Sequence, residues 1–337
     1  MVEWRKIKEV AMEAIDLTDR TFTDEAKARA YFERIRWPHG PVCPHCGNAD
    51  GSRIYSIAAN VSQGVREGLK ECQDCHKQFT VRTGSVMESS HLPLTKWALA
   101  FRLMSSAKKG ISAHQMSRTL DISYKAAWFL CHRIREAMRD NSGERLGGKG
   151  KVVEGDETYV GGKPRKGTGW GYDTQKDRKT MVQVLVERDG RARAIPVADP
   201  FPRVLKHNIG KHIAAGTEMH TDENPAYKNV HKITGAPHLT VNHGAGEYAK
   251  EDIHVNTAES WNALLKRSIV GSFHHVSREH LSRYCDEVSF RWDRRSMDDT
   301  QRTEAAIRGG DRKRLTYRRA RRSKYASENA PPSAPIF

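Results

Sequence analysis

Val152-Val-Glu-Gly-Asp-Glu-Thr-Tyr-Val160 is rich in β-branched and aromatic residues and contains three acids, so it predicts a β-strand with a chemical role. Four more strand-like segments follow it, at 180–187, 191–197, 217–222 and 239–241. Asp189-Gly190 is a strong hairpin signal between the first two of these. Helical patterns lie at about 200–214 and from 257 to 295. Residues 150–298 therefore predict an α/β domain.

The order of these elements predicts which strands are neighbours. A strand, two hairpin strands, a helix, two further strands and a helix is the order of an RNase H-like mixed sheet with flanking helices. In that fold the first and fourth strands lie side by side, and the last helix crosses their ends. Asp156 lies in the first strand, Asp222 ends the fourth strand 66 residues later, and Glu259 opens the helix after a further 37 residues. We therefore expect these three carboxylates to meet.

Three carboxylates that meet in this way suit phosphodiester chemistry. Hard oxygen ligands hold two Mg²⁺ ions about 4 Å apart, one ion activating the nucleophile and the other stabilising the leaving oxygen. We predict that Asp156, Asp222 and Glu259 bind catalytic Mg²⁺, or Mn²⁺, which accepts the same ligands. Glu259 and Lys266 share one helix face, which places Lys266 near substrate phosphate. The alternative is a salt-bridged surface helix with ordinary surface acids. The places of the three acids in this order of strands and helix argue against it.

Two C-x-x-C pairs lie in the turn-rich part of the chain between residues 41 and 90. Cys43-Pro-His-Cys46 and Cys72-Gln-Asp-Cys75 are separated by 25 residues. Each pair can form a tight knuckle, and four thiolates close a tetrahedral Zn²⁺ site with a structural role. A redox dithiol is the alternative, but it would need one pair at a helix N-terminus and not two matching pairs. The spacing therefore predicts a zinc ribbon with Cys43, Cys46, Cys72 and Cys75 as ligands.

Residues 112–128 have the pattern of two short helices around a tight turn. Ser112 and Ser123 are natural helix N-caps, and the apolar residues near them can form a small shared core. This pattern predicts a helix-turn-helix, although plain three-helix packing gives the same spacing. We expect the second helix to contact a DNA duplex through four side chains, those of Tyr124, Lys125, Trp128 and His132.

The net charge favours a nucleic-acid partner. The 337 residues include 57 Lys and Arg against 41 Asp and Glu, a formal charge of +16. Such an excess attracts polyanions with a salt-dependent affinity, so double-stranded DNA is the expected partner and a merely soluble basic protein is the alternative. No apolar run approaches the roughly 20 residues that span a bilayer, so we expect no membrane contact. The polar first 30 residues are unlike a signal peptide and predict a cytoplasmic protein.

These patterns divide the chain into five predicted parts. They are a helical lead-in at 1–40, a zinc ribbon at 41–90, a helix-turn-helix region at 91–145, the RNase H-like domain at 150–298, and a basic, partly disordered tail at 299–337. Thr23 is the expected N-cap of a helix over 25–35 in the lead-in. Leu146-Gly-Gly-Lys-Gly-Lys151 is typical of a linker. Cys131 and Cys285 lie in apolar helical contexts, which predicts that both are buried.

Several ordered segments resemble the DDE transposases of the ISXO-like group of bacterial insertion sequences. In the α/β part these are Val153-Glu-Gly-Asp-Glu-Thr-Tyr-Val-Gly-Gly-Lys163, His220-Thr-Asp-Glu223 and His254-Val-Asn-Thr-Ala-Glu259, followed by Leu265-Lys266. In the cysteine part they are Trp37-Pro-His-Gly-Pro-Val-Cys-Pro-His-Cys-Gly47 and Phe79-Thr-Val-Arg-Thr-Gly84. The resemblance covers nearly all of residues 20–295.

The resemblance implies a transposase that binds the terminal inverted repeats of an insertion sequence, cleaves DNA and transfers the strand. It also implies a homo-oligomer assembled on DNA and a nucleoid-associated location in a bacterium. The family's catalytic positions correspond to Asp156, Asp222 and Glu259, with Lys266 on the lysine after the third acid. Some relatives have Asn in place of the third acid, which makes Asn256 the alternative for that role.

Two histidines lie near the predicted site, and the sequence is also compatible with two other functions. His243 and His254 lie in segments similar to the family near the site. One alternative function is a zinc-ribbon and helix-turn-helix DNA-binding regulator whose core is catalytically inactive, and the intact trio of acids argues against it. The other alternative is an RNase H-like nuclease or resolvase, which would hydrolyse DNA without joining ends.

Overall fold

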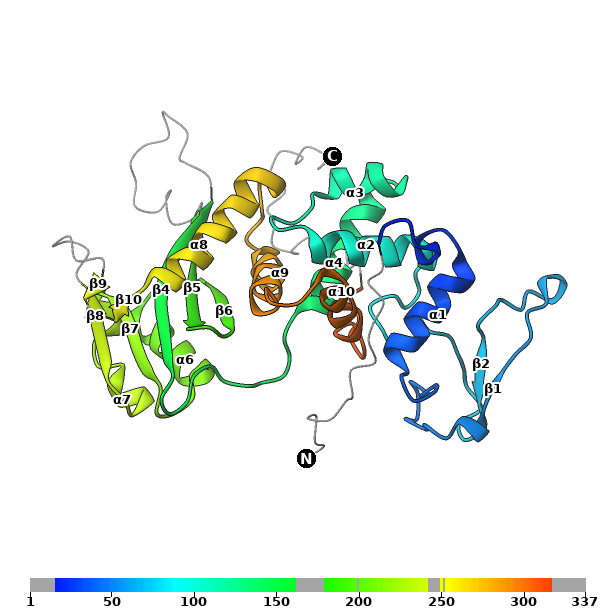
Figure 1. Ribbon diagram of the computed structural model, residues 1–337, viewed down its shortest axis with the longest axis horizontal. Helices are drawn as coiled ribbons and strands as arrows, with labels where there is room; N and C mark the ends of the chain where they lie inside the picture. Colours follow the sequence, from blue (N-terminus) through cyan, green and yellow to red (C-terminus); the bar gives the residue numbers. More distant parts are fainter. Residues whose placement is uncertain (1–15, 162–178, 199, 242–248, 251, 317–337) are drawn as a thin grey trace, which may run out of the picture.

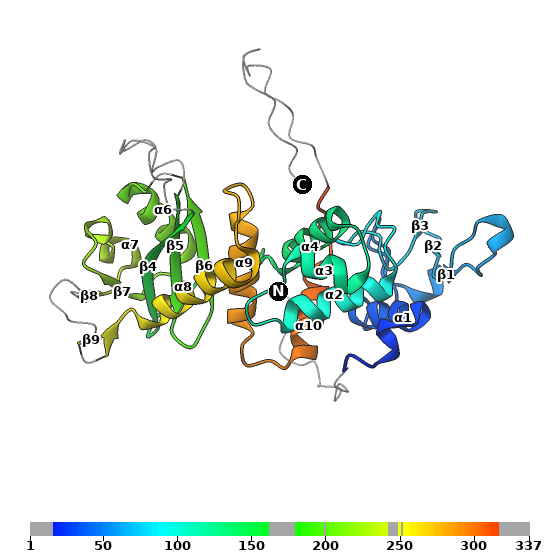
Figure 2. The same cartoon turned by 90° about the horizontal axis from the view of Figure 1, so that it is seen from above.

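The computed structural model describes residues 16–161, 179–198, 200–241, 249–250 and 252–316. A five-stranded mixed sheet lies at one end of an elongated molecule, and the small strands β1 and β2 lie at the other, with helices between them (Figures 1 and 2). None of the described helices is both long and apolar enough to cross a membrane.

The large sheet is built around β4 (Val152–Gly161), the acid-containing strand. Its strand order is β6-β5-β4-β7-β8. The other strands are β5 (Lys179–Glu187), β6 (Ala192–Val197), β7 (Glu218–Asp222) and β8 (His238–Val241), close to the predicted segments. β4 pairs antiparallel with β5 and parallel with β7, with Gly155 opposite Thr221. The fourth strand therefore lies beside the first, as the order of elements predicts.

Helices cover both faces of this sheet because successive side chains of β4 point to opposite sides. On one face Val160, Val182 and Val184 pack against Trp261 and Leu265 of α8 (Asn256–Ser268). On the other face Val153, Leu185 and Met219 pack with Ile209 of α6 (Pro202–His212). The remaining short elements are a 3₁₀ turn at Pro225–Tyr227, α7 (His231–Thr234), and the paired β9 (Ala249–Lys250) and β10 (Ile253–His254).

The N-terminal body combines a small sheet with helices around one apolar core. Strands β1 (Ile54–Ser56), β2 (Lys70–Cys72) and β3 (Gln78–Phe79) form an antiparallel sheet. The helices are α1 (Glu25–Arg36), α2 (Leu94–Ser106), α3 (Ala113–Leu120) and α4 (Tyr124–Met138), with 3₁₀ turns at Arg20–Phe22, Gly51–Arg53 and Val61–Gln63. The N-cap of α1 is Asp24 and not Thr23, because the Asp24 carboxylate accepts the N–H groups of Ala26 and Lys27 at 2.8 and 3.2 Å.

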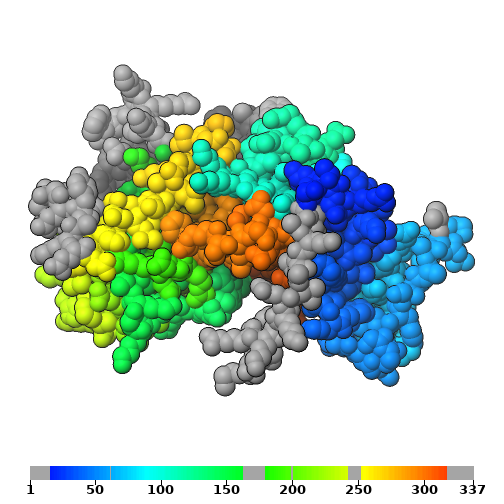
Figure 3. Space-filling model, viewed as in Figure 1, coloured from blue at the N-terminus to red at the C-terminus, as the bar shows by residue number. Residues whose placement is uncertain are grey.

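Two C-terminal helices join this body to the sheet. A π-helical turn (Ile269–Phe273) follows α8, and α9 (Leu281–Asp293) then packs on both β6 and α4. Figure 3 shows α9 and α10, in orange, between the sheet and the N-terminal body. At this seam the Arg135 Nε of α4 donates to Glu287 Oε2 of α9 at 2.6 Å, and Arg291 pairs with the same buried carboxylate. Cys131 and Cys285 are fully buried, as predicted.

The structure differs from two of the sequence predictions about the connecting segments. Residues Asp299–Arg308, expected to begin a partly disordered tail, form α10, whose Ala306 and Ile307 are buried in the N-terminal core. Asp298 starts this helix with a capping box, a local signal that the basic composition obscured. The predicted linker is also partly packed, because Leu146 is fully buried in the core beneath α6.

Candidate active site

Parallel pairing of β4 and β7 brings two predicted acids together. Because Gly155 lies opposite Thr221, the next residues in register are Asp156 and Asp222. Ligand oxygens of Asp156, Asp222 and one further acid, Glu157, all lie within 4.8 Å of one another. Three carboxylates this close repel one another unless a cation or protons neutralise them, and oxygen ligands are what Mg²⁺ and Mn²⁺ prefer. The geometry therefore fits a divalent cation.

Glu157 is held in this cluster by the segment that follows β7. Tyr227 donates its hydroxyl to Glu157 Oε1, and Asn224 Nδ2 donates to Glu157 Oε2 at 3.1 Å. The backbone N–H of Asn224 also donates to Asp222 Oδ1 at 3.1 Å. Burial raises the pKa of Glu157 to about 7, the charge of Asp222 acts in the same direction, and the Tyr227 hydrogen bond opposes both. Protonation of a carboxyl is thus favoured here when no cation balances the charge.

Asp156 is tied to helix α8 by a direct contact. Asn262, one turn after Glu259 on that helix, donates its Nδ2 to Asp156 Oδ2 at 2.7 Å. Burial raises the pKa of Asp156, and the charges of Asp222 and Glu259 raise it further, while hydrogen bonds from Glu157 N–H and Asn262 lower it. Glu259 is therefore close enough to Asp156 for its negative charge to raise the pKa of the Asp156 carboxyl.

The structure places the other predicted residues of α8 around this cluster. Glu259 lies in the first turn and is exposed, and it is outside the group of acids within 4.8 Å of one another. Lys266 is exposed in the last turn, and Asn256 is the exposed first residue of the helix. His243 lies outside the described residues. The structure thus brings Asp156 and Asp222 together, whereas Glu259 stands beside them.

A buried carboxylate fixes the start of α8 against β4. Glu154 Oε2 accepts the backbone N–H groups of Thr257 and Ala258 at 2.8 and 3.1 Å, and Glu154 Oε1 accepts the Thr257 hydroxyl at 2.9 Å. Arg188 Nε donates to Glu154 Oε1 at 2.8 Å, and Nδ1 of His254 lies 3.2 Å from the same oxygen. A negative charge at a helix N-terminus is favourable, so Glu154 docks the helix that contains Glu259 and Asn262 onto the strand that contains Asp156.

The four cysteines form one compact cluster at the other end of the molecule. Cys43 Sγ lies 3.6 Å from Cys75 Sγ, and Cys46 Sγ lies 3.7 Å from Cys72 Sγ. A tetrahedral Zn²⁺ with Zn–S bonds of about 2.3 Å requires sulfur–sulfur separations of about 3.8 Å. The cluster therefore fits one structural Zn²⁺, with all four predicted ligands in place.

Helices α3 and α4 pack as a pair around a tight turn at Asp121, whose φ is 48°. Ser112 and Ser123 cap them, accepting the N–H groups of Gln115 and Ala126 at 3.1 and 3.2 Å. Tyr124 is 39% exposed and its ring stacks on that of His114, with centroids 4.3 Å apart. The exposed start of α4 therefore offers an aromatic surface for a partner.

The other side chains predicted to contact DNA lie in different surroundings. Lys125 is exposed, and Trp128 is half-buried with its ring 5.2 Å from that of His280. His132 is fully buried between Trp128, His280 and Tyr284, so the prediction that it contacts DNA is wrong. The helical repeat placed it one turn after Trp128, but α9 covers that turn.

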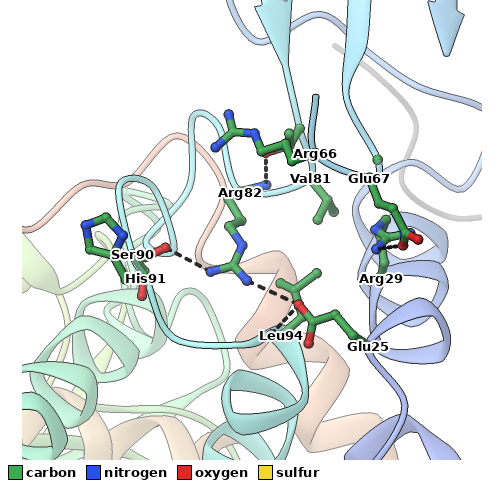
Figure 4. A pocket seen from close by; sticks show the side chains of 11 residues that line it. Glu25, Arg29, Arg66, Glu67, Val81, Arg82, Ser90, His91 and Leu94 are labelled. Atoms are coloured by element: carbon green, nitrogen blue, oxygen red, sulfur yellow. Dashed lines mark hydrogen bonds and ion pairs between the residues drawn. The ribbon is translucent and has the colours of Figure 1, made fainter. Parts of the chain in front are cut away.

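A cavity of about 400 Å³ lies between α1, the segment after β3 and the start of α2 (Figure 4). Four of its charged side chains form two ion pairs. Arg82 donates to the carbonyls of Ser90 and Leu92 and lies 3.4 Å from Glu25, and Arg29 lies 2.7 Å from Glu67. These contacts join the zinc-ribbon part to the helices, which makes a structural joint the better interpretation of this cavity.

Sequence reasoning missed Glu157, Asn224, Tyr227 and Glu154. Adjacent strand residues point to opposite faces, so Glu157 was not expected to join Asp156. The acidic pair Asp156-Glu157 in the middle of the strand was the available signal. Asn224 and Tyr227 lie within five positions after Asp222, where the chain must turn, and nothing in their types indicated which carboxylate they contact.

Comparisons with known proteins agree with this arrangement of two sites. An ISXO2-like transposase domain matches residues 145–293, which contain the predicted acids, and a transposase zinc-ribbon domain matches residues 23–78, which contain the four cysteines. A protein of Halobacterium salinarum, described as an uncharacterized protein in the transposable element ISH50, is 30% identical over 277 residues. That similarity covers 79% of this chain and 90% of the relative.

Proposed function

Because this chain belongs to the family of insertion-sequence transposases with an ISXO2-like domain and a transposase zinc ribbon, we propose that it cleaves DNA at the ends of its element and transfers the strands to a target. The observation that carries this proposal is the meeting of Asp156 and Asp222 across the parallel pair β4–β7. The strand order β6-β5-β4-β7-β8, with α8 across the acidic strand, supports an RNase H-like sheet.

In the proposed reaction Asp156 and Asp222 hold divalent cations, and Glu259 completes their coordination from α8. When bound, Mg²⁺ or Mn²⁺ activates the attacking oxygen, first of water and then of a DNA 3′-hydroxyl, and stabilises the leaving oxygen. Asn262 aligns Asp156, and Glu154 aligns the helix. Lys266, exposed on the same helix, contacts a substrate phosphate. The protein thus contributes mainly alignment and charge.

DNA recognition is assigned to the N-terminal body. We propose that α3 and α4 are a helix-turn-helix whose second helix contacts duplex DNA through Tyr124, Lys125 and Trp128. The exposed start of α4 and the aromatic stack of Tyr124 on His114 support this role. Two element ends must be processed together, so we also propose that the protein assembles as a homo-oligomer on DNA.

An assay for strand transfer tests the proposal. A labelled duplex that contains the sequence flanking the reading frame is incubated with the protein, Mg²⁺ and a supercoiled target plasmid. The expected products are strands cut at the inverted repeat and then joined to the plasmid. Cutting without joining would support a nuclease instead, and a bound but uncut duplex would support a regulator.

A further inference from the structure

Glu157 lies among the predicted metal ligands although no DDE position corresponds to it. Its carboxylate oxygen is within 4.8 Å of ligand oxygens of both Asp156 and Asp222. Glu259, the expected third ligand, is outside this group. Among the described residues, a cation bound between β4 and the end of β7 would therefore contact Glu157 together with the two aspartates.

The segment after β7 orients Glu157 by two neutral donors. Asn224 Oδ1 accepts the Ala226 N–H at 3.0 Å, which fixes the amide so that its Nδ2 points to Glu157 Oε2. Tyr227, a fully buried side chain, donates to the other carboxylate oxygen. Neutral donors orient a carboxylate without cancelling its charge, which leaves that charge available for a cation.

A second, independent feature beside the same cluster points to a ligand. Asn262 is only 5% exposed, and its Nδ2 must face Asp156 because a carboxylate accepts and does not donate. Its Oδ1 is buried and has no hydrogen-bond partner among the described residues. An unpaired buried amide oxygen is costly, so a polar group that the described residues do not supply, a cation or its water, is expected next to it.

From these observations we propose that Glu157 is a direct ligand of the catalytic cation, together with Asp156 and Asp222, and that Tyr227 and Asn224 orient it. This inference rests on the proposed function. Glu157 supplies the third ligand from within the sheet, and Glu259 adds a fourth from the docked helix α8 when DNA is bound. The site then contains four carboxylates, one more than the DDE pattern.

Binding of Mn²⁺ alone tests the proposal on the full-length, zinc-loaded protein. The Mn²⁺ affinity is measured by electron paramagnetic resonance and by calorimetry for the wild type and for Glu157→Gln. Loss of a group that only orients a ligand already lowers metal affinity by roughly 10–100-fold, so we expect the loss of a direct ligand to cost at least this much. Asp189→Asn is the matched control, because it removes the same charge at the hairpin turn where a positive φ also suits Asn. Its Mn²⁺ affinity should equal that of the wild type.

Two more variants separate the possible outcomes. Glu157→Asp keeps the charge but withdraws the carboxylate by one methylene, so a ligand role predicts weaker Mn²⁺ binding, and wild-type affinity in Glu157→Asp would overturn the proposal even if Glu157→Gln failed to fold. Asp156→Asn tests the cation site itself. If Asp156→Asn loses Mn²⁺ while Glu157→Gln binds it normally, the Glu157 inference is wrong and the proposed function stands. If both bind Mn²⁺ as the wild type does, the cation site of the proposed function is wrong as well.

Discussion

The thiolate cluster and the carboxylate cluster are both candidate metal sites, but they are assembled in opposite ways. All four cysteines lie between residues 43 and 75, and each C-x-x-C pair forms its own knuckle. The carboxylates come from β4 and β7. Asp156 and Asp222 are 66 positions apart in the sequence and meet because the two strands pair in parallel. One site depends on local spacing and the other on the topology of the whole sheet. The two sites should therefore respond differently to the same kind of change.

The largest expected effect is loss of the zinc site. Cys72→Ser removes one of four thiolates, and binding energy on the order of 10 kcal/mol stabilises such a fold. We expect the zinc content to fall from one ion per chain to near zero, and proteases to cut the segment between Cys43 and Thr83. Metal analysis and limited proteolysis measure both. Cys131→Ser, at a buried cysteine outside the cluster, should keep its zinc. Full zinc retention in Cys72→Ser would show that the cluster is not the binding site.

The carboxylate site should lose activity while keeping its fold. Asp156→Asn removes one charge from the cation site, and we expect at least a thousandfold slower cleavage (~4 kcal/mol at roughly 1.4 kcal/mol per decade). Zinc content and binding to the inverted repeats should persist. Asp222→Asn should behave alike, whereas Asp189→Asn should cleave normally. Cleavage at wild-type rates by both site variants would exclude this cluster as the catalytic centre.

The third acid needs its own comparison, because Glu259 lies beside the cluster and not within it. We expect Glu259→Gln to abolish cleavage and Lys266→Ala to reduce it less, since Lys266 contacts phosphate and not metal. The rates are measured on pre-nicked and intact repeat ends. Normal cleavage by Glu259→Gln together with an inactive Asn256→Ala would transfer the role of third ligand to Asn256.

The contrast between the two sites explains how much the sequence could predict. Knuckle spacing alone gave all four zinc ligands, since each pair closes on itself. Element order predicted the β4–β7 pairing, and with it Asp156 and Asp222. Glu157 was missed because strand alternation separates adjacent side chains, and only the hydrogen bonds from Asn224 and Tyr227 show where its carboxylate goes.

Packing between distant parts of the chain was less predictable. His132 follows the helical repeat toward a DNA-facing surface, yet α9, about 150 residues later, covers it. The basic composition after residue 298 likewise concealed α10, whose apolar residues are few and fit the N-terminal core. Periodicity identifies an apolar helix face, but it does not predict which element will cover a face of mixed apolar and polar residues.

A smaller effect is expected from the residue that docks α8. Glu154→Gln weakens the N-terminal anchor of the helix and leaves Arg188 without its buried partner, a kind of loss that costs about 3–5 kcal/mol. We expect a lower melting temperature and cleavage slowed roughly 10–100-fold, less than in Asp156→Asn. Added Mg²⁺ should recover part of the rate, since the direct ligands remain. A destabilised variant with wild-type cleavage kinetics would limit Glu154 to a purely structural role.

The smallest effect is expected at the contact between α4 and α9, and it is a change in stability that depends on pH. Burial lowers the pKa of His132 to about 2, and the positive charges of Arg135, His280 and Arg283 act in the same direction. The folded pKa lies below the unfolded value of about 6.5, so the unfolded chain binds a proton here before the folded protein does. The free energy of unfolding is therefore highest above pH 6.5 and decreases as the pH falls below it, by at most about 1.4 kcal/mol per pH unit. His132→Leu removes this titration. The free energy of unfolding of the variant should therefore decrease less steeply than that of the wild type over roughly one pH unit, between pH 6.5 and 5.5. Urea unfolding followed by tryptophan fluorescence, with zinc content checked at each pH, measures both slopes. Equal slopes would mean that protonation of His132 does not contribute to the loss of stability in acid.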